Sequence, residues 1–194
     1  MRLLEFNKNT TFREIDPHVI RAIQNSDYRF FESFKYTEFF QNYYYDAEKF
    51  KENFNLLHLS IILSNDLRMV EYFDKSKDYN NCGRCLRNEK TRQRGRIGLR
   101  LLPIELAIKY RRLDIVEYFA ENYFKNYKFD FPLITRCIDF CRYLRDFECE
   151  GDDNDNDDES TKQKDEYEKI IMYLKNILSL LRKKHLSNVF KNVL

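Results

Sequence analysis

The sequence predicts an all-α fold built from stacked helix pairs. Residues 56–73 and 102–119 are near copies of each other: each has an apolar stripe, a polar break and a second stripe that ends in Val-Glu-Tyr-Phe. Self-similarity of this kind marks repeated units that bury their apolar faces against their neighbours. The 194-residue chain has only four Gly and three Pro, and this favours helices over the many turns of a β-sandwich or barrel.

The apolar spacing within each copy predicts two short helices. A small residue, Ser60 or Ala107, lies inside the first stripe of each copy and would let two helices approach closely. Two further units, one before and one after these copies, have Ala22 and Cys137 at the same position. The predicted units are about 16–50, 55–80, 101–130 and 131–181, within a single domain spanning 1–194. An unrelated bundle of ordinary amphipathic helix pairs remains the alternative.

The positions of proline and glycine agree with these units. Pro17, Pro103 and Pro132 are each expected in the first turn of a helix, where the missing N–H costs nothing. The four glycines, at 83, 95, 98 and 151, lie in the two segments that we interpret as insertions. We therefore expect no Pro or Gly inside a helix beyond its first turn.

Two short motifs resemble ankyrin repeats. Residues 57–60 (Leu-His-Leu-Ser) and 103–107 (Pro-Ile-Glu-Leu-Ala), each followed by Leu-x-x-Val-Glu-Tyr-Phe, are similar to the family's Thr-Pro-Leu-His-x-Ala and second helix. The chain departs from that pattern, since Asn55 and Leu102 replace the threonine and the glycine of the helix–helix turn is absent. The repeat spacing is also about 46 rather than about 33 residues.

This resemblance covers roughly residues 16–181 and implies a short ankyrin-like solenoid of about four helix-pair repeats with two long loop insertions. It also implies that His58, at the position of the motif's histidine, is structural and braces a turn through hydrogen bonds. Residues 96–108 are similar to part of the cytoplasmic ankyrin region of some transient receptor potential channels, which implies only a shared style of repeat.

The first insertion, 74–101, is strongly basic. Residues 84–112 hold ten basic side chains against two acidic ones, a local field that attracts anionic surfaces over about a Debye length. A solvated loop that keeps the protein soluble is one interpretation, and an acidic partner surface is another. Polyanion or nucleic-acid binding through 84–100 is the alternative function, although no aromatic residue interleaves the run to stack bases.

The cysteines give no complete metal site. Cys82-x-x-Cys85 is half of a zinc ribbon, and tetrahedral zinc needs two more ligands. Cys137 and Cys141 share a helix face one turn apart, but apolar packing explains them equally well. We therefore assign no metal and no cofactor, and keep Cys82 and Cys85 as the only candidates. The odd total of five Cys indicates a reduced, intracellular protein.

The second insertion is acidic. Residues 148–159 hold eight acids and no base, so the acidic insertion 148–164 is expected to be disordered. It lacks the Gly and the terminal Glu of an EF-hand loop, and weak attraction of divalent cations is the alternative interpretation. A helical stripe over 170–181 is predicted to be the last packed helix, and 182–194 to form a C-terminal cap over the end of the stack.

These features predict an intracellular protein–protein interaction module, adaptor-like or inhibitor-like, without catalysis. No phosphate loop, nucleophile motif or catalytic carboxylate pair is present. No apolar run is long enough to span a membrane, and a cytoplasmic location, with the nucleus as an option, is expected. The partner is predicted to be another protein, and one with an acidic surface is favoured. The candidate contact residues are Tyr43, Tyr45, Arg92, Arg94, Arg96, Lys109, Tyr110 and Arg111.

Overall fold

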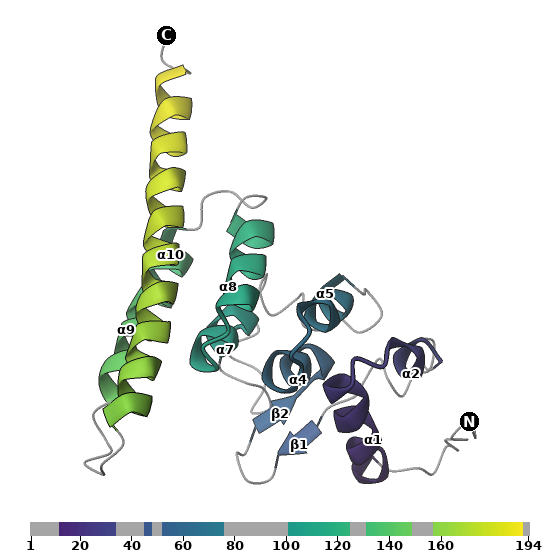
Figure 1. The fold of residues 1–194 in the computed structure, drawn as a ribbon. Helices are drawn as coiled ribbons and strands as arrows, with labels where there is room; N and C mark the ends of the chain where they lie inside the picture. Colours follow the sequence, from purple (N-terminus) through teal and green to yellow (C-terminus); the bar gives the residue numbers. More distant parts are fainter. Residues whose placement is uncertain are drawn as a thin grey trace. The chain divides into compact units, whose positions relative to one another are not determined.

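The computed structural model describes residues 12–33, 45–47, 52–75, 101–124, 131–148 and 157–191. The chain divides into two compact units, Met1–Leu102 and Pro103–Leu194. Within the described residues, eight α-helices and one π-helical turn make up nearly all of the regular structure (Figure 1). The all-α class predicted from the sequence is therefore confirmed. A small two-stranded ribbon in the first unit was not predicted.

The first unit consists of two helix pairs separated by the ribbon. Its elements are α1 (Phe12–Gln24), α2 (Tyr28–Glu32), β1 (Tyr45–Ala47), β2 (Glu52–Phe54), α4 (Leu56–Leu63) and α5 (Leu67–Lys75). Helix α4 is central, since it packs against α1, α5 and β2 and is buried over almost its whole circumference. The rings of Phe31 and Phe73 meet edge to face with centroids 4.9 Å apart, an arrangement that aromatic pairs favour in cores.

The start of α4 is fixed by a reciprocal capping box. Asn55 accepts a hydrogen bond from the backbone N–H of His58 through Oδ1 at 2.9 Å. In return, the backbone N–H of Asn55 donates to Nδ1 of His58 at 3.5 Å. Two helix-end donors are thereby satisfied in a buried setting. This is the turn-bracing role expected for His58.

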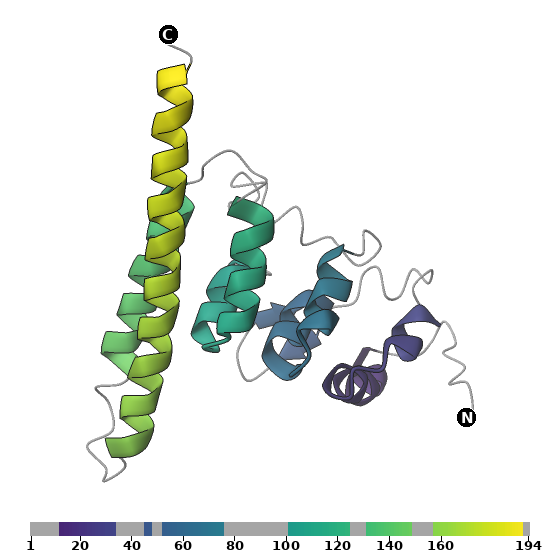
Figure 2. The same cartoon turned by 45° about the horizontal axis from the view of Figure 1, so that its top comes forward.

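The second unit contains α7 (Pro103–Lys109), α8 (Leu113–Phe119), the π-helical turn η2 (Ala120–Phe124), α9 (Phe131–Glu148) and α10 (Asp157–Lys191). Helix α7 packs against both α8 and α9, and α10 packs against α9 and α8. Figures 1 and 2 show α9 and α10 as an antiparallel hairpin in which α10 is much the longer helix. None of the described helices combines the length and apolarity that crossing a membrane requires.

The turns inside two helix pairs use the same hydrogen bonds although neither contains glycine. Ser26 and Arg111 both adopt positive φ, 52° and 55°. After each, the next backbone N–H reaches the carbonyl five residues earlier, from Asp27 to Ala22 at 2.8 Å and from Arg112 to Ala107 at 2.9 Å. This is the Schellman arrangement, which usually places Gly at the left-handed position. Ser26 and Arg111 therefore adopt a left-handed conformation that is sterically unfavourable for residues other than glycine.

Two of the three prolines lie where they were predicted. Pro103 is the first residue of α7 and Pro132 the second residue of α9. The expectation was wrong for Pro17, which lies inside α1, five residues after its start at Phe12. Proline inside a helix removes a hydrogen bond and crowds the preceding turn. The Pro17 ring is solvent-exposed, so it does not displace any side chain of the buried core.

Two boundaries near the C-terminal end also need correction. Helix α10 begins at Asp157, so 157–164 of the insertion expected to be disordered are helical. The same helix continues without a break to Lys191, so 182–191 do not form a separate cap. The helix is longer than expected for two reasons. Acidic residues at its N-terminus and basic residues at its C-terminus interact favourably with the helix macrodipole. Helix α9 also gives α10 a long surface to pack against. The predicted stripe is buried, with Ile170, Ile171, Leu174, Leu178 and Leu181 facing inward.

Candidate protein-binding surface

Helix α7 is joined to α9 by an ion pair whose carboxylate is buried and whose guanidinium is partly exposed. Glu105 is only 1% exposed, and its Oε1 lies 2.6 Å from Nε of Arg136 in α9. A buried carboxylate is tolerated only with such charge-assisted hydrogen bonding. Glu105 stands where the ankyrin motif has His, and His58 stands there in the first unit. At this position, each unit therefore buries a polar side chain that holds the local structure.

The turn between α7 and α8 carries three predicted contact residues, and they do not behave alike. Arg111 turns toward α10, where its Nε lies 3.1 Å from Oε2 of Glu166 and its guanidinium 5.9 Å from the ring centroid of Tyr167. The Tyr167 hydroxyl also donates to the backbone carbonyl of Lys109 at 3.5 Å. The side chains of Lys109 and Tyr110 are exposed. Of the three residues, Lys109 and Tyr110 are therefore the exposed ones, whereas Arg111 connects the turn to α10.

The other predicted contact residues are placed less fully. The backbone of Tyr45 pairs with Phe54 in the ribbon. Tyr43 and the arginines Arg92, Arg94 and Arg96 lie outside the described residues, as do Cys82 and Cys85. The predictions for these residues, including polyanion binding through 84–100, therefore remain predictions.

Helix α9 displays an aromatic stripe that sequence reasoning missed. Phe140, Tyr143 and Phe147 follow one another at helical spacing, and Tyr143 and Phe147 are 54% and 67% exposed. The rings of these two residues pack on each other, with centroids 4.5 Å apart and planes inclined by 32°. Large aromatic side chains with little rotamer entropy are typical anchors of protein interfaces. We name Phe140, Tyr143 and Phe147 the α9 aromatic stripe.

A polar face lies beside this stripe. Asp139 and Arg142 form an ion pair at 3.1 Å, and Asp146 pairs with Arg145 at 2.7 Å. The hydrogen bond from Arg145 lowers the pKa of Asp146 below its usual range. Arg145 also pairs with Glu168 on α10. The exposed surface of α9 is therefore charged on this face, and its exposed large apolar side chains are Tyr143 and Phe147 of the aromatic stripe.

The two described cysteines belong to the core. Cys137 and Cys141 are both buried and reduced, and the Cys141 thiol donates to the Tyr167 carbonyl at 3.5 Å. Burial, reinforced by the nearby Glu168 carboxylate, raises the pKa of Cys141 to about 12. A thiol with that pKa is a poor metal ligand and a poor nucleophile. In the part of the chain that the structure describes, no three His, Cys, Asp or Glu side chains group closely enough to hold a metal ion.

The spacing of α9 contained the signal that reveals the aromatic stripe. Ile134, Cys137, Cys141 and Leu144 form one buried stripe at the usual helical spacing. The aromatic residues form a second stripe on the same helix. Helix α9 packs against α7 and α10, and the first stripe is buried while Tyr143 and Phe147 of the second remain exposed. The repeat pattern in the sequence ends at Ile138, before the second stripe begins at Phe140.

Comparison of the chain with family models, with curated proteins and with solved structures finds no match. The described residues define an all-α protein of two compact units. Its second unit has exposed aromatic side chains beside charged ones.

Proposed function

We propose that the chain is an ankyrin-like stack of helix pairs that binds another protein and has no catalytic activity. The observation that carries this proposal is the recurrence of one pattern of burial in four helices that are far apart in sequence. Stacked helix pairs mostly offer extended surfaces rather than pockets, and the exposed aromatic side chains on α9 provide such a surface with anchors.

The pattern involves three positions of the first helix in each pair: an apolar residue, the small residue three positions later, and the aliphatic residue after that. All twelve side chains are 5% exposed or less. They are Val19, Ala22 and Ile23; Leu57, Ser60 and Ile61; Ile104, Ala107 and Ile108; and Ile134, Cys137 and Ile138. A common register of this kind supports a shared packing mode, because close approach of helices requires the small residue at the crossing.

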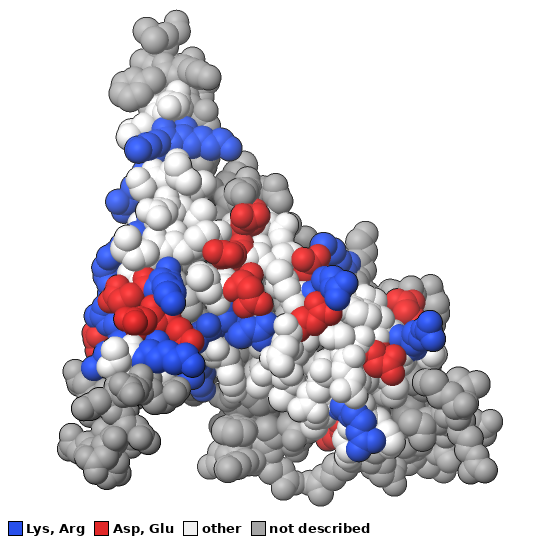
Figure 3. Space-filling model, in the orientation of Figure 1, with Lys and Arg blue, Asp and Glu red and all other residues white. Residues whose placement is uncertain are grey.

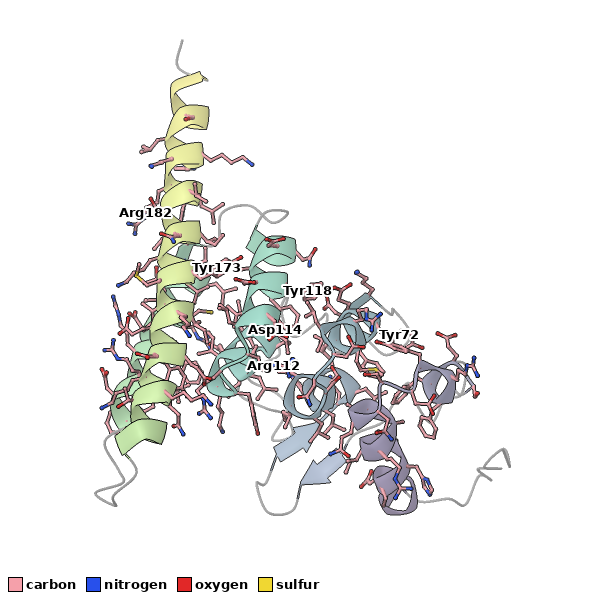
Figure 4. All side chains as sticks on the ribbon, viewed as in Figure 1. Tyr72, Arg112, Asp114, Tyr118, Tyr173 and Arg182 are labelled. Atoms are coloured by element: carbon pink, nitrogen blue, oxygen red, sulfur yellow. The ribbon has the colours of Figure 1, made fainter. Side chains whose placement is uncertain are left out.

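The second helices support the same interpretation. In both copies of Val-Glu-Tyr-Phe, Val and Phe are buried while Glu and Tyr remain partly exposed. The Tyr72 hydroxyl donates to Glu32 of the preceding pair at 2.7 Å. Tyr173, at the corresponding place on α10, has a pKa raised by burial and then by Glu121 and Glu117 of the preceding pair. Figure 4 shows both tyrosines on their helices.

The ribbon also fits the proposal. Ankyrin-like repeats place a protruding finger between consecutive helix pairs, and β1 and β2 lie between the α1–α2 and α4–α5 pairs. Tyr45 is in this ribbon. Residues 135, 139, 142 and 146 of α9 are exposed and polar, and a terminal repeat needs such a face where no further repeat covers it. The basic insertion favours a partner with an acidic patch.

The test is a comparison of captured partners. Full-length protein and a Tyr143→Ser/Phe147→Ser variant are used to capture proteins from native lysate at low and high salt. A partner retained by the wild type should lose affinity for the variant by at least about tenfold, as for truncated interface anchors. Met172→Ser, which changes an equally exposed apolar side chain of α10, is the matched control. A partner set that is the same for all three proteins would contradict the proposal.

A further inference from the structure

The distal part of α10 stands beyond the helices that pack on it. The ring of Phe131, the first residue of α9, lies 5.8 Å from the ring of His185. Because the two helices are antiparallel, α10 continues past the beginning of α9 from about His185 onward. Figures 1 and 2 both show this part of α10 extending beyond α8 and α9. The residues that lead up to this point are already exposed on most sides of the helix, since 182–187 are all exposed and only Leu181 is buried against the unit.

This end of α10 is strongly cationic. After Glu168 the sequence has six Lys or Arg and no Asp or Glu. Arg182, Lys183 and Lys184 are all exposed, and no ion pair is recorded for them within the described residues. Successive helical residues are about 100° apart, so these three and His185 encircle the helix. Figure 3 shows blue side chains near the upper end of α10 with no red beside them, and Figure 4 shows Arg182 directed away from α8.

Exposed leucines stand on either side of this cationic ring. Leu180 is 61% and Leu186 55% exposed. They are six residues apart, so they point in directions about 120° apart around the helix. A rigid protein groove would contact a single stripe of the helix. A fluid surface that is anionic outside and apolar beneath can contact side chains that point in several directions. Its anionic groups would contact the cations, and its apolar interior would contact the leucines.

We propose that residues 180–186 of α10 bind the surface of an anionic lipid bilayer. The cations would attract acidic headgroups, and Leu180 and Leu186 would enter the boundary between headgroups and acyl chains while the lysine stems extend toward the headgroups. Nucleic acid matches the charge equally well but offers the leucines no apolar partner. The binding is peripheral. It is also independent of the protein-binding function proposed above, which uses α9.

The test is sedimentation of the full-length protein with vesicles. Wild-type protein should bind vesicles of equal parts phosphatidylcholine and phosphatidylserine, but not vesicles of phosphatidylcholine alone. A Lys183→Glu/Lys184→Glu variant should lose at least about tenfold in partition coefficient, since each basic residue near such a surface contributes about a factor of five. Lys162→Glu/Lys164→Glu, which makes the same charge change in the acidic part of the same helix, is the matched control and should bind as wild type.

Two further variants separate the possible sources of binding. Leu180→Ser/Leu186→Ser should weaken vesicle binding severalfold and leave retention on heparin unchanged. If that variant binds vesicles normally, the ligand is a generic polyanion and the lipid assignment is overturned. The assignment is equally overturned if wild type ignores acidic vesicles, if the control variant is as defective as Lys183→Glu/Lys184→Glu, or if only Arg92→Glu/Arg94→Glu/Arg96→Glu abolishes binding. Far-ultraviolet circular dichroism verifies that each variant keeps its helix content.

Discussion

His58 should make the first unit less stable as the pH falls. Burial lowers the pKa of this histidine to about 4, from an ordinary value of 6.5. Its Nδ1 accepts the Asn55 N–H in the capping box, so protonation would both charge a buried ring and remove that acceptor. The unfolded chain, in contrast, takes up a proton near pH 6.5. The free energy of unfolding therefore keeps the full contribution of neutral His58 above about pH 7.5 and loses it progressively as the pH falls toward 4.

The size of the effect follows from the two pKa values. Between them, the free energy of unfolding falls by at most about 1.4 kcal/mol per pH unit. From pH 7.5 to pH 5 the loss from His58 is about 2 kcal/mol. This is a large part of the stability of a small unit, since domains are typically stable by about 5–15 kcal/mol.

The assay is urea unfolding followed by circular dichroism at several pH values, because the chain has no Trp. The reference is His58→Gln, which does not titrate and whose amide can still reach back to the Asn55 N–H, as in an ordinary capping box. All other titratable groups are common to both proteins, so their contributions to the pH dependence cancel. The difference between wild type and variant should shrink by about 2 kcal/mol between pH 7.5 and pH 5. Parallel curves would refute the reasoning, because they would mean that His58 is as solvated in the folded chain as in the unfolded one.

Three further predictions concern a turn, an ion pair and the buried cysteines. Ser26→Gly should stabilise the first unit by about 1 kcal/mol in urea unfolding, since glycine removes the left-handed strain of that turn; a loss of stability would show that the turn is not left-handed. Arg136→Met should lower the free energy of unfolding by about 2 kcal/mol, because it removes the guanidinium that pairs with the buried Glu105 carboxylate. Glu105→Met should lower it less, because the partly exposed Arg136 can be solvated. Equal costs would contradict this asymmetry. Iodoacetamide should label Cys137 and Cys141 only after denaturation, as peptide mass spectrometry would show, and rapid labelling in native protein would mean that the core around them opens readily.

The helix pairs could be predicted because their signals are local. The stripes with Ser60 and Ala107 repeat at helical spacing, and a stripe of that kind can be buried only by a neighbouring helix. The capping role of His58 was accessible for the same reason, since a cap and its partner are three residues apart. The left-handed turns were less accessible. Ser26 and Arg111 give no sequence signal for positive φ, which the tight packing of the two helices imposes on them.

The placement of charged groups was harder to predict because it depends on contacts that are distant in sequence. Arg111 looked like a surface residue until the structure placed it 3.1 Å from Glu166, fifty-five positions further along. Glu105 stands where the ankyrin motif has histidine, and its ion-pair partner Arg136 belongs to the next helix pair. A single sequence shows which side chains are charged, but it does not show which of them are neutralised by folding.

The charges along α10 connect its stability with its exposed end. Its first twelve residues, 157–168, are predominantly acidic, and its remaining residues carry only positive charge. This order matches the helix dipole at both ends, so the acidic insertion becomes the start of a helix rather than an extended loop. The same order places uncompensated cations at the end of α10 that no described helix covers. An even mixture of charges would lose the dipole contribution at both ends and the cationic ring as well. The polarity that favours helix formation is therefore also what makes the distal end attractive to an anionic surface.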